Sequence, residues 1–170
     1  AEYDKTLKSP SGLSGGDGEK MRKYNKDGKN LCGPFMGLAM EKAIKMGESN
    51  ACMKRIVAAP TAGSCGVIPA VFLAYEIGSA SAMAAAGLAY LEGGDAECIS
   101  NAMAFALKNM LGLTCDPVCG LVEVPCIKRN SAGAVNAISS AQMAMAGIRS
   151  AITPDEVIDS MRRIGNELPA

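Results

Sequence analysis

The stretch SASAMAAAGLAYL, residues 79–91, constrains the fold most, because it holds thirteen consecutive residues without a charge and most of them are small. Alanine has the highest intrinsic helix propensity, and small side chains let a helix approach its neighbours closely. Residues 34–48 show apolar side chains at helical spacing, with Pro34 suited to the first turn. Candidate strands are few and short. The chain is therefore expected to be mostly or wholly helical.

Capping signals predict where further helices begin and end. Asp95 is a good N-cap for a helix over residues 95–110, and Asn130 is one for a helix over residues 131–148. The sequence Thr-Pro-Asp-Glu at residues 153–156 is a capping box, and Gly165 is expected to end the helix that it starts. The predicted fold is one all-α domain over residues 1–170, with irregular loops that carry cysteine and glycine.

Composition excludes several classes of partner. Lys and Arg number 17, equal to Asp and Glu, and aromatic residues make up 4%, so neither a basic surface nor stacking side chains for nucleic acid are present. No apolar run reaches the ~20 residues that a membrane span needs. Seven cysteines, spread through Ala- and Gly-rich segments, favour a reducing compartment, and we expect a cytoplasmic protein.

Histidine is absent, which narrows the chemistry. A Ser–His or Cys–His dyad and a His-ligated zinc site are excluded for this chain. A general base has to be a lysine, a carboxylate, a thiolate or a tyrosine, or it has to come from another chain.

The segment LGLTCDPVCGLVEVPCIKRN, residues 111–130, holds three of the cysteines. Cys115 follows a predicted helix end, and Cys126 follows Pro125 shortly before the next predicted helix. Two thiols that bracket an irregular loop between rigid elements can hold a metal. Their spacing matches neither zinc-knuckle nor ferredoxin patterns, and free cysteine is also a common buried residue. The residues alone leave a metal site and buried thiols as alternatives.

Two more segments are candidates for anion binding. Small residues in PTAGSCG let backbone N–H groups approach a carboxylate or phosphate, although such a loop can also be a tight helix–helix connection; they include Thr61, Ala62, Gly63 and Ser64. In IKRN, Lys128 and Arg129 precede a predicted helix N-terminus, where the helix dipole disfavours cations. An anion can bind there, or both side chains are simply solvated.

The motifs SPSGLSGGD, AAPTAGSCGVIPA, GSASAMAAAGLA and GLTCDPVCGLVEVPCIKRN resemble, in this order, those of the bacterial iron–sulfur L-serine dehydratases, in their alpha chain or C-terminal domain. The likeness runs over residues 9–169. It implies a [4Fe–4S] cluster with Cys115 and Cys126 as two of three cysteine ligands, an iron that acts as a Lewis acid on the serine hydroxyl, and residues 61–64 near the substrate carboxylate. It also implies a beta subunit or an N-terminal domain that supplies the base, in a homo- or hetero-oligomer.

One departure from the family pattern concerns the third ligand. The family carries that cysteine in a GCQAE-like stretch just before IGSASAMAAAG, whereas here PAVFLAY is followed directly by EIGSASAM, near residues 74–77. Either a segment is deleted or the residues printed on each side are not chain neighbours. Cys119 and Cys65 match non-ligand positions. The alternative function is a structural thiolate–metal module or a helical interaction module without catalytic activity.

Overall fold

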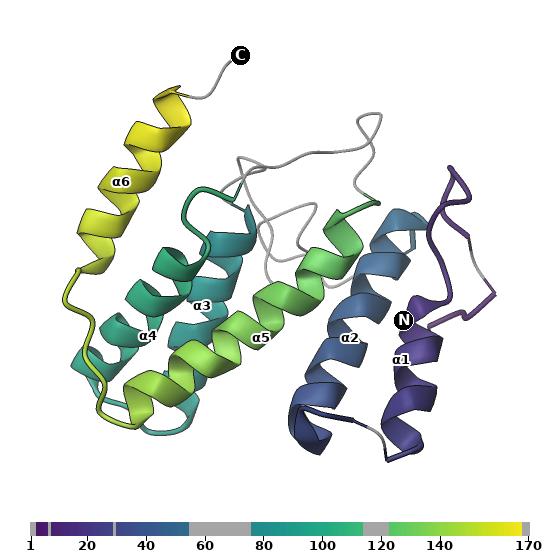
Figure 1. Ribbon diagram of the computed structural model, residues 1–170, viewed down its shortest axis with the longest axis horizontal. Coiled ribbons are helices and arrows are strands. Elements are labelled where there is room, and N and C mark those ends of the chain that lie inside the picture. Colours follow the sequence, from purple (N-terminus) through teal and green to yellow (C-terminus); the bar gives the residue numbers. More distant parts are fainter. Residues whose placement is uncertain (1–2, 7, 29, 55–75, 114–122, 168–170) are drawn as a thin grey trace. The chain divides into compact units, whose positions relative to one another are not determined.

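The structure is a computed structural model that describes residues 3–6, 8–28, 30–54, 76–113 and 123–167 (Figure 1). Every regular element in these residues is an α-helix: α1 (Asp17–Lys26), α2 (Gly33–Ala51), α3 (Glu76–Leu91), α4 (Ala96–Asn109), α5 (Cys126–Met145) and α6 (Pro154–Glu167). The all-α prediction is thus confirmed over the described residues. None of these helices combines the length and apolar character that crossing a membrane requires.

The chain forms two compact units, each built from two separate stretches of sequence. Unit 1 comprises Ala1–Val71 and Asp116–Val135, and unit 2 comprises Phe72–Cys115 and Asn136–Ala170. Helix α5 therefore contributes its first half to unit 1 and its second half to unit 2. The candidate site residues that the structure describes all belong to unit 1.

Alanine dominates the core of unit 2. Helices α3 and α4 pack against each other through side chains that are almost fully buried, and α5 and α6 add to the same core: Ala82, Ala85, Ala89, Ala102, Ala106, Leu107, Ala137, Ala144 and Val157. Asn136 joins three of these helices, because its amide nitrogen donates to Ser81 Oγ at 2.8 Å and to the Ala106 carbonyl at 3.0 Å. The small side chains predicted to permit close helix packing do so here.

Two predicted caps in unit 2 are confirmed. Asp95 accepts a hydrogen bond from the Cys98 N–H at 2.8 Å and caps α4. Before α6, the Thr153 N–H donates to Glu156 Oε2 at 2.7 Å, the reciprocal bond of a capping box. Gly165 does not end α6, which continues to Glu167; a lone glycine weakens a helix interior but does not terminate it.

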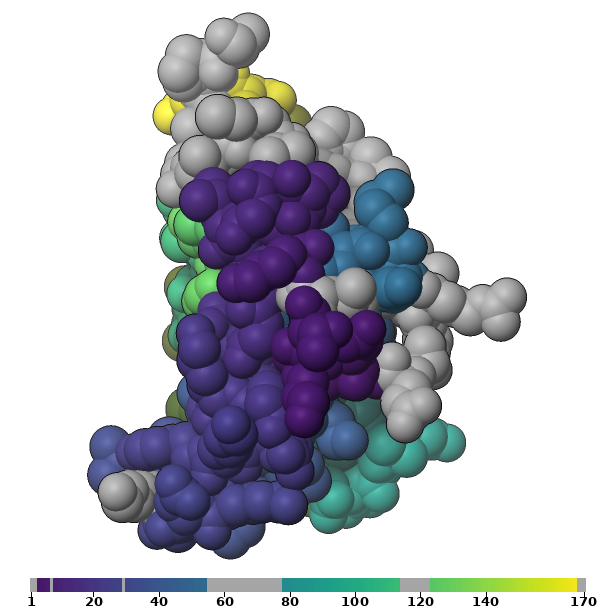
Figure 2. Space-filling view, turned by 90° about the vertical axis from the view of Figure 1, so that its right-hand side faces the viewer, coloured from purple at the N-terminus to yellow at the C-terminus, as the bar shows by residue number. Residues whose placement is uncertain are grey.

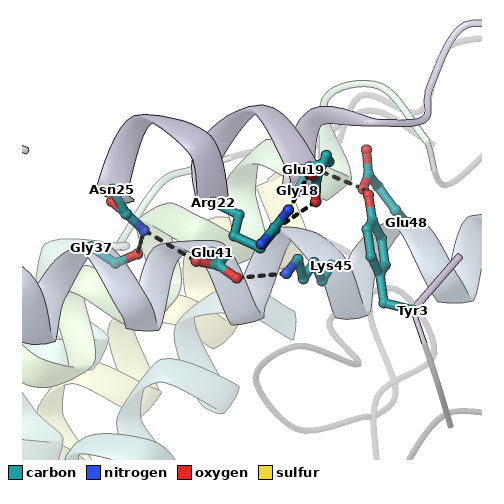
Figure 3. A network of polar contacts seen from close by, with 9 residues as sticks. All are labelled: Tyr3, Gly18, Glu19, Arg22, Asn25, Gly37, Glu41, Lys45 and Glu48. Carbon is teal, nitrogen blue, oxygen red and sulfur yellow. Dashed lines mark hydrogen bonds and ion pairs between the residues drawn. The ribbon is translucent and has the colours of Figure 1, made fainter. Parts of the chain in front are cut away.

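In unit 1, α1 packs against α2 through polar side chains (Figure 3). The Asn25 amide of α1 donates to the Gly37 carbonyl at 2.8 Å and to Glu41 Oε2 at 3.3 Å in α2. Within α2, Lys45 Nζ lies 2.6 Å from Glu41 Oε1. Glu41 is only 6% exposed, so its carboxylate depends on these partners. Figure 2 shows the N-terminal residues and α1, in purple, on the face of unit 1 that the view presents.

Two elements of unit 1 differ from the prediction. We predict no helix over residues 17–26 from the sequence, and the Ser- and Gly-rich composition of residues 9–18 favours a flexible connector there. Helix α5 begins at Cys126 rather than Ser131, so Asn130 lies inside the helix and is not its N-cap. The Asn130 side chain is fully buried and donates to the Cys126 carbonyl at 2.9 Å. Lys128 and Arg129 therefore lie in the first turn of α5 instead of preceding it.

Candidate functional site

The motif SPSGLSGGD forms a closed turn ahead of α1. The Ser9 N–H donates to the Ser14 carbonyl at 2.9 Å, and the Gly12 N–H donates to the Ser9 carbonyl at 2.8 Å. The Ser14 N–H also donates to Ser9 Oγ at 3.2 Å, so Ser9 and Ser14, at the two ends of the turn, are joined by two hydrogen bonds. Gly12 has φ of +75°, a conformation that costs a glycine little. The loop thus has a fixed shape, unlike a connector.

Glu123 attaches this turn to the segment that leads into α5. Its carboxylate is 5% exposed and accepts a short hydrogen bond from the Ser11 hydroxyl, across 112 positions of sequence. Burial alone would raise the pKa of Glu123, but hydrogen bonds from the Ser11 and Ser9 hydroxyls and from the Ser11 N–H hold that pKa below its ordinary value. Two motifs that are far apart in the sequence therefore meet through a buried, charged carboxylate.

Glu48 fixes the start of α1 in the same motif. Gly16, the N-cap, has no side chain to satisfy the first amides of the helix. The Glu48 carboxylate accepts from the Asp17 N–H at 2.6 Å, the Gly18 N–H at 3.1 Å and the Tyr3 hydroxyl at 2.6 Å (Figure 3). Burial, followed by the hydrogen bond to Glu48, raises the pKa of Tyr3 above its ordinary range. A residue of α2 therefore caps α1 from outside it.

Gly18 makes this arrangement sterically accessible. A Cβ at this position would lie 2.5 Å from Lys45 Cγ and 3.0 Å from Glu48 Oε2. The first distance is shorter than any real contact of a Cβ atom. Gly18, the last glycine of SGGDG, is thus required by its close packing on α2, where Glu48 and Lys45 lie.

Cys126 occupies the first position of α5, three residues after Glu123. Its side chain is buried, with the residue 7% exposed, and it forms no disulfide. The N-terminal end of a helix carries a partial positive charge, which favours an anionic group such as a thiolate. Cys126 therefore lies at the start of a helix, where the helix dipole favours a thiolate and burial disfavours it.

Lys128 joins the two motifs a second time. Its Nζ lies 2.6 Å from Asp17 Oδ2, while Lys20 Nζ lies 2.8 Å from Asp17 Oδ1. These two ammonium groups hold the pKa of Asp17 below its ordinary value. Arg129 lies on the same turn of α5 and is partly buried. We call this meeting of residues 9–18 with residues 123–130 the motif junction.

The motif junction also holds a buried hydroxyl of unexplained purpose. Ser14 is 3% exposed, and its Oγ has no hydrogen-bond partner among the residues that the structure describes. A buried hydroxyl without a partner is costly and uncommon in folded proteins. A polar group placed against this hydroxyl would supply the partner that it lacks among the described residues.

Most of the other predicted site residues lie outside the described residues: Thr61, Ala62, Gly63, Ser64 and Cys115, as well as the non-ligand residues Cys65 and Cys119 and positions 74–75. A cubane [4Fe–4S] cluster takes up to four thiolates. Within the described ranges Cys126 is the one predicted ligand, and no group of three or more Cys, Asp or Glu is placed to hold a metal ion. The described part of the site fits such a cluster in ligand type, but its ligand set is incomplete.

Sequence reasoning missed the carboxylates that organise the site. Glu48 stands between Gly47 and Ser49, and Glu123 stands between Val122 and Val124; neither setting shows which distant groups the carboxylate binds. Both act on the glycine- and serine-rich motif from distant sequence positions. The one available signal is the motif itself, because a turn with several glycines and serines leaves amides and hydroxyls that need acceptors.

Comparison with known proteins covers the whole chain. The family model "Serine dehydratase alpha chain" matches residues 1–76 and residues 74–170. A probable L-serine dehydratase alpha chain of Bacillus subtilis is 44% identical, over 95% of this chain and 67% of the relative. The L-serine dehydratase alpha chain of Peptoniphilus asaccharolyticus is 36% identical, over 90% of this chain and 66% of the relative. An L-serine dehydratase of Escherichia coli is 36% identical over 37% of its length.

The chain spans about two thirds of the length of the first two relatives. The match is also interrupted internally, because the two pieces of the family match meet at residues 74–76. The alignment with the Bacillus relative is 201 residues long, while 95% of this 170-residue chain is about 162 residues. About 40 aligned positions therefore have no residue of this chain opposite them. The Peptoniphilus alignment, 193 residues long over 90% of the chain, gives the same difference.

Proposed function

The chain belongs to the family of serine dehydratase alpha chains, and on that premise we propose that it is the alpha part of an enzyme that converts L-serine to pyruvate and ammonia. The observation that carries the proposal is the family match over the full chain, with the relatives named as L-serine dehydratases. In this reaction serine loses its α-proton and its β-hydroxyl as water. The resulting 2-aminoacrylate tautomerises and is hydrolysed to pyruvate and ammonia.

The proposed cofactor is a [4Fe–4S] cluster with Cys115 and Cys126 as two of its thiolate ligands. Such a cluster, with one iron open to substrate, supplies a Lewis acid for a departing hydroxide. The contribution of this chain's described residues is positional. Helix α5 holds the Cys126 thiol at its first turn, and Glu123 holds the 9–18 motif beside that turn. The family's third cysteine falls in the stretch that is missing before residue 76, so we propose that the remaining thiolate comes from outside this sequence.

Residues 61–64, with their small side chains and the hydroxyls of Thr61 and Ser64, are proposed to receive the substrate carboxylate. Lys128 and Arg129 are proposed as further anion contacts. Lys128 is already paired with Asp17 at 2.6 Å, so an incoming carboxylate has to exchange with that side chain. The unpartnered Ser14 hydroxyl on the same motif supports a polar ligand near this point.

The general base is proposed to lie on a partner. This chain has no histidine, and its relatives are named as alpha chains, a term that implies a second part. We propose a beta subunit or an N-terminal domain as that part, in an oligomer located in the reducing cytoplasm.

The test is anaerobic reconstitution of the chain with iron, sulfide and excess small thiol, followed by iron analysis and a pyruvate assay with L-serine and a beta part. A small thiol can occupy an iron position that no protein cysteine fills. We expect iron and sulfide in cluster ratio, broad absorption near ~400 nm, and pyruvate only with the beta part present. If the cluster assembles in full and the beta part is present, but no pyruvate forms from L-serine, the assignment of serine as substrate is contradicted.

The variant Cys126→Ser tests the ligand assignment, with Cys98→Ser as the matched control. Cys98 lies in α4 of unit 2, where its thiol contacts Met145 Sδ at 3.4 Å. We expect Cys126→Ser to lose most of the bound iron and Cys98→Ser to retain it. Equal iron in the two variants would remove Cys126 from the ligand set. Tight zinc binding in place of iron, without pyruvate, would favour a structural metal module instead.

A further inference from the structure

Helix α3 has an outward side that carries no charge. After Glu76 the helix contains no charged residue up to its end at Leu91. Met83 is 40% exposed, Tyr90 69% and Leu91 78%. A helix that is apolar on every side is ordinarily covered on every side. The exposed side of α3 therefore has the composition of a surface that packs against another element.

The first two turns of α3 form one wall of an apolar groove within unit 2. The groove encloses about 570 Å³ between α3, α4 and α6. Its apolar lining consists of Ala82, Met83, Met103, Leu107, Ile158 and Met161, and Arg162 is the one charged residue of the described lining. A groove of this size holds many water molecules. Apolar walls around so much water are unfavourable, and methionine side chains adapt readily to an incoming apolar surface.

Helix α6 contributes to this groove a face that is only partly covered. Val157 is 2% exposed and belongs to the core, whereas Ile158, next to it, is 50% exposed and lines the groove. Met161, one turn further, is partly buried and lines it too. The apolar side of α6 is thus wider than the surface that unit 2 offers it.

The interruption of the family match lies at the same end of α3. The two matched pieces meet at residues 74–76, and α3 begins at Glu76. Met83 is seven residues further along, about 10 Å at 1.5 Å per helical residue. The alignments have about 40 positions with no residue here, enough for two helices of average length with their connections. The meeting point of the two matched pieces assigns those extra positions to the stretch just before α3, whose first two turns border the groove in this chain.

We propose that the groove between α3, α4 and α6 is the binding site of this segment of about 40 residues, and that the groove is open among the described residues because this chain lacks the segment. The segment is expected to place the apolar side of a helix against Met83, Met161 and Ile158. The proposal rests on the family match and on the described residues of unit 2, and its test requires neither a cluster nor serine.

The experiment restores the segment. The corresponding residues of the Bacillus subtilis relative are inserted between positions 75 and 76. The control is a Gly/Ser insert of the same length, because it is flexible and has no apolar side chains to bind in the groove. The readouts are fluorescence of an apolar dye and hydrogen exchange of amides in residues 79–83 and 158–166. We expect the natural insert to lower dye fluorescence and to slow exchange at least about tenfold, while the Gly/Ser insert changes neither.

A matched pair of substitutions locates the effect. Met83→Lys places a charge in the groove, whereas Met145→Lys places one on α5 at a residue of similar exposure, 42% against 40%, outside the groove lining. In the chain with the natural insert, Met83→Lys is expected to restore dye fluorescence and fast exchange, and Met145→Lys is not. Equal effects of both substitutions, or no protection by the natural insert, would overturn the proposal.

A second copy of the chain is the competing occupant. Analytical ultracentrifugation of the original chain, without any insert, shows whether it is a monomer or a dimer and so distinguishes the two occupants. A dimer that Met83→Lys converts to monomer, and that the natural insert leaves intact, would show that a second copy covers the groove and would overturn the proposal. A monomer, or a dimer that the natural insert dissociates, supports it.

Discussion

Among the described residues, the buried side chains of the two units differ in chemistry. In unit 1 the buried residues include serines and carboxylates, among them Ser9, Ser14, Glu41, Glu48 and Glu123. In unit 2 the core is mainly alanine, with only short polar links such as Asn136. The motifs that resemble catalytic ones are held in the polar unit by charged hydrogen bonds across long sequence distances. The alanine core of unit 2 needs only close packing. The loops of unit 1 are thus positioned by polar contacts, whereas the helices of unit 2 are held by the close packing of small side chains.

The largest effect is expected for Glu48→Ala in unit 1. This change leaves the Asp17 N–H, the Gly18 N–H and the Tyr3 hydroxyl without their acceptor. Unsatisfied buried donors cost 1–3 kcal/mol each, so the loss in unfolding free energy should reach about 3 kcal/mol. Urea denaturation followed by circular dichroism measures it, and hydrogen exchange should show α1 opening first. The control Glu92→Ala removes an exposed carboxylate; a similar loss there would break the comparison.

For unit 2 the corresponding change is one of shape. Ala85 is fully buried between helices, and Ala85→Leu adds three carbons where the core has no room for them. Overpacking of this kind costs about 2 kcal/mol. The matched change Ala96→Leu, at an exposed position of α4, should be near neutral in the same denaturation experiment. A tolerated Ala85→Leu would mean that the alanine core is not closely packed.

The same glycine-to-alanine change should act in opposite directions in the two units. Gly18→Ala should destabilise by about 1–2 kcal/mol, because its Cβ meets Lys45 Cγ at 2.5 Å and displaces that side chain from Glu41. Gly87→Ala, inside α3, meets nothing within 4 Å and should stabilise by about 0.5–1 kcal/mol through helix propensity. Thermal unfolding of both variants tests this, and a gain in stability from Gly18→Ala would refute the close packing on α2.

The smallest effect concerns acid stability. The pKa of Glu123 is held below its ordinary value of 4.5 in the fold, so its contribution is complete above pH 4.5 and is lost as the pH falls below that value. At pH 7, Glu123→Gln should therefore lower the free energy of unfolding by about 1 kcal/mol. Between pH 7 and pH 3, however, the free energy of unfolding of this variant should fall less than that of the original chain. Ser11→Ala should show part of the same change, and the exposed Ser139→Ala none. Parallel pH profiles of all four chains would contradict the buried charge.

Sequence reasoning was most successful where the signal and its structural effect lie within one turn. The Asp95 cap and the capping box at residues 153–156 each satisfy amides three residues away, and both are confirmed. It failed at α1 and at the start of α5. The cap of α1 is Glu48, which accepts from the Asp17 N–H 31 positions away. Asn130 donates to the Cys126 carbonyl within α5 instead of capping that helix. The roles of the site residues all stay predictions: Cys115, Cys126, Lys128, Arg129 and residues 61–64.

By itself the sequence determined the helical fold of the described residues, through alanine content and local caps, and it pointed to the family through motifs along the whole chain. It also contains the interruption before residue 76. Only the tertiary structure decided that Glu123 and Lys128 join the serine–glycine motif to the first turn of α5, with Cys126 at its start. Only the tertiary structure, too, decided that the uncharged side of α3 borders an open groove. The reason is physical: local hydrogen bonds and propensities are set by neighbours in the chain, whereas the burial of a charge or an apolar face depends on residues that folding brings from far away.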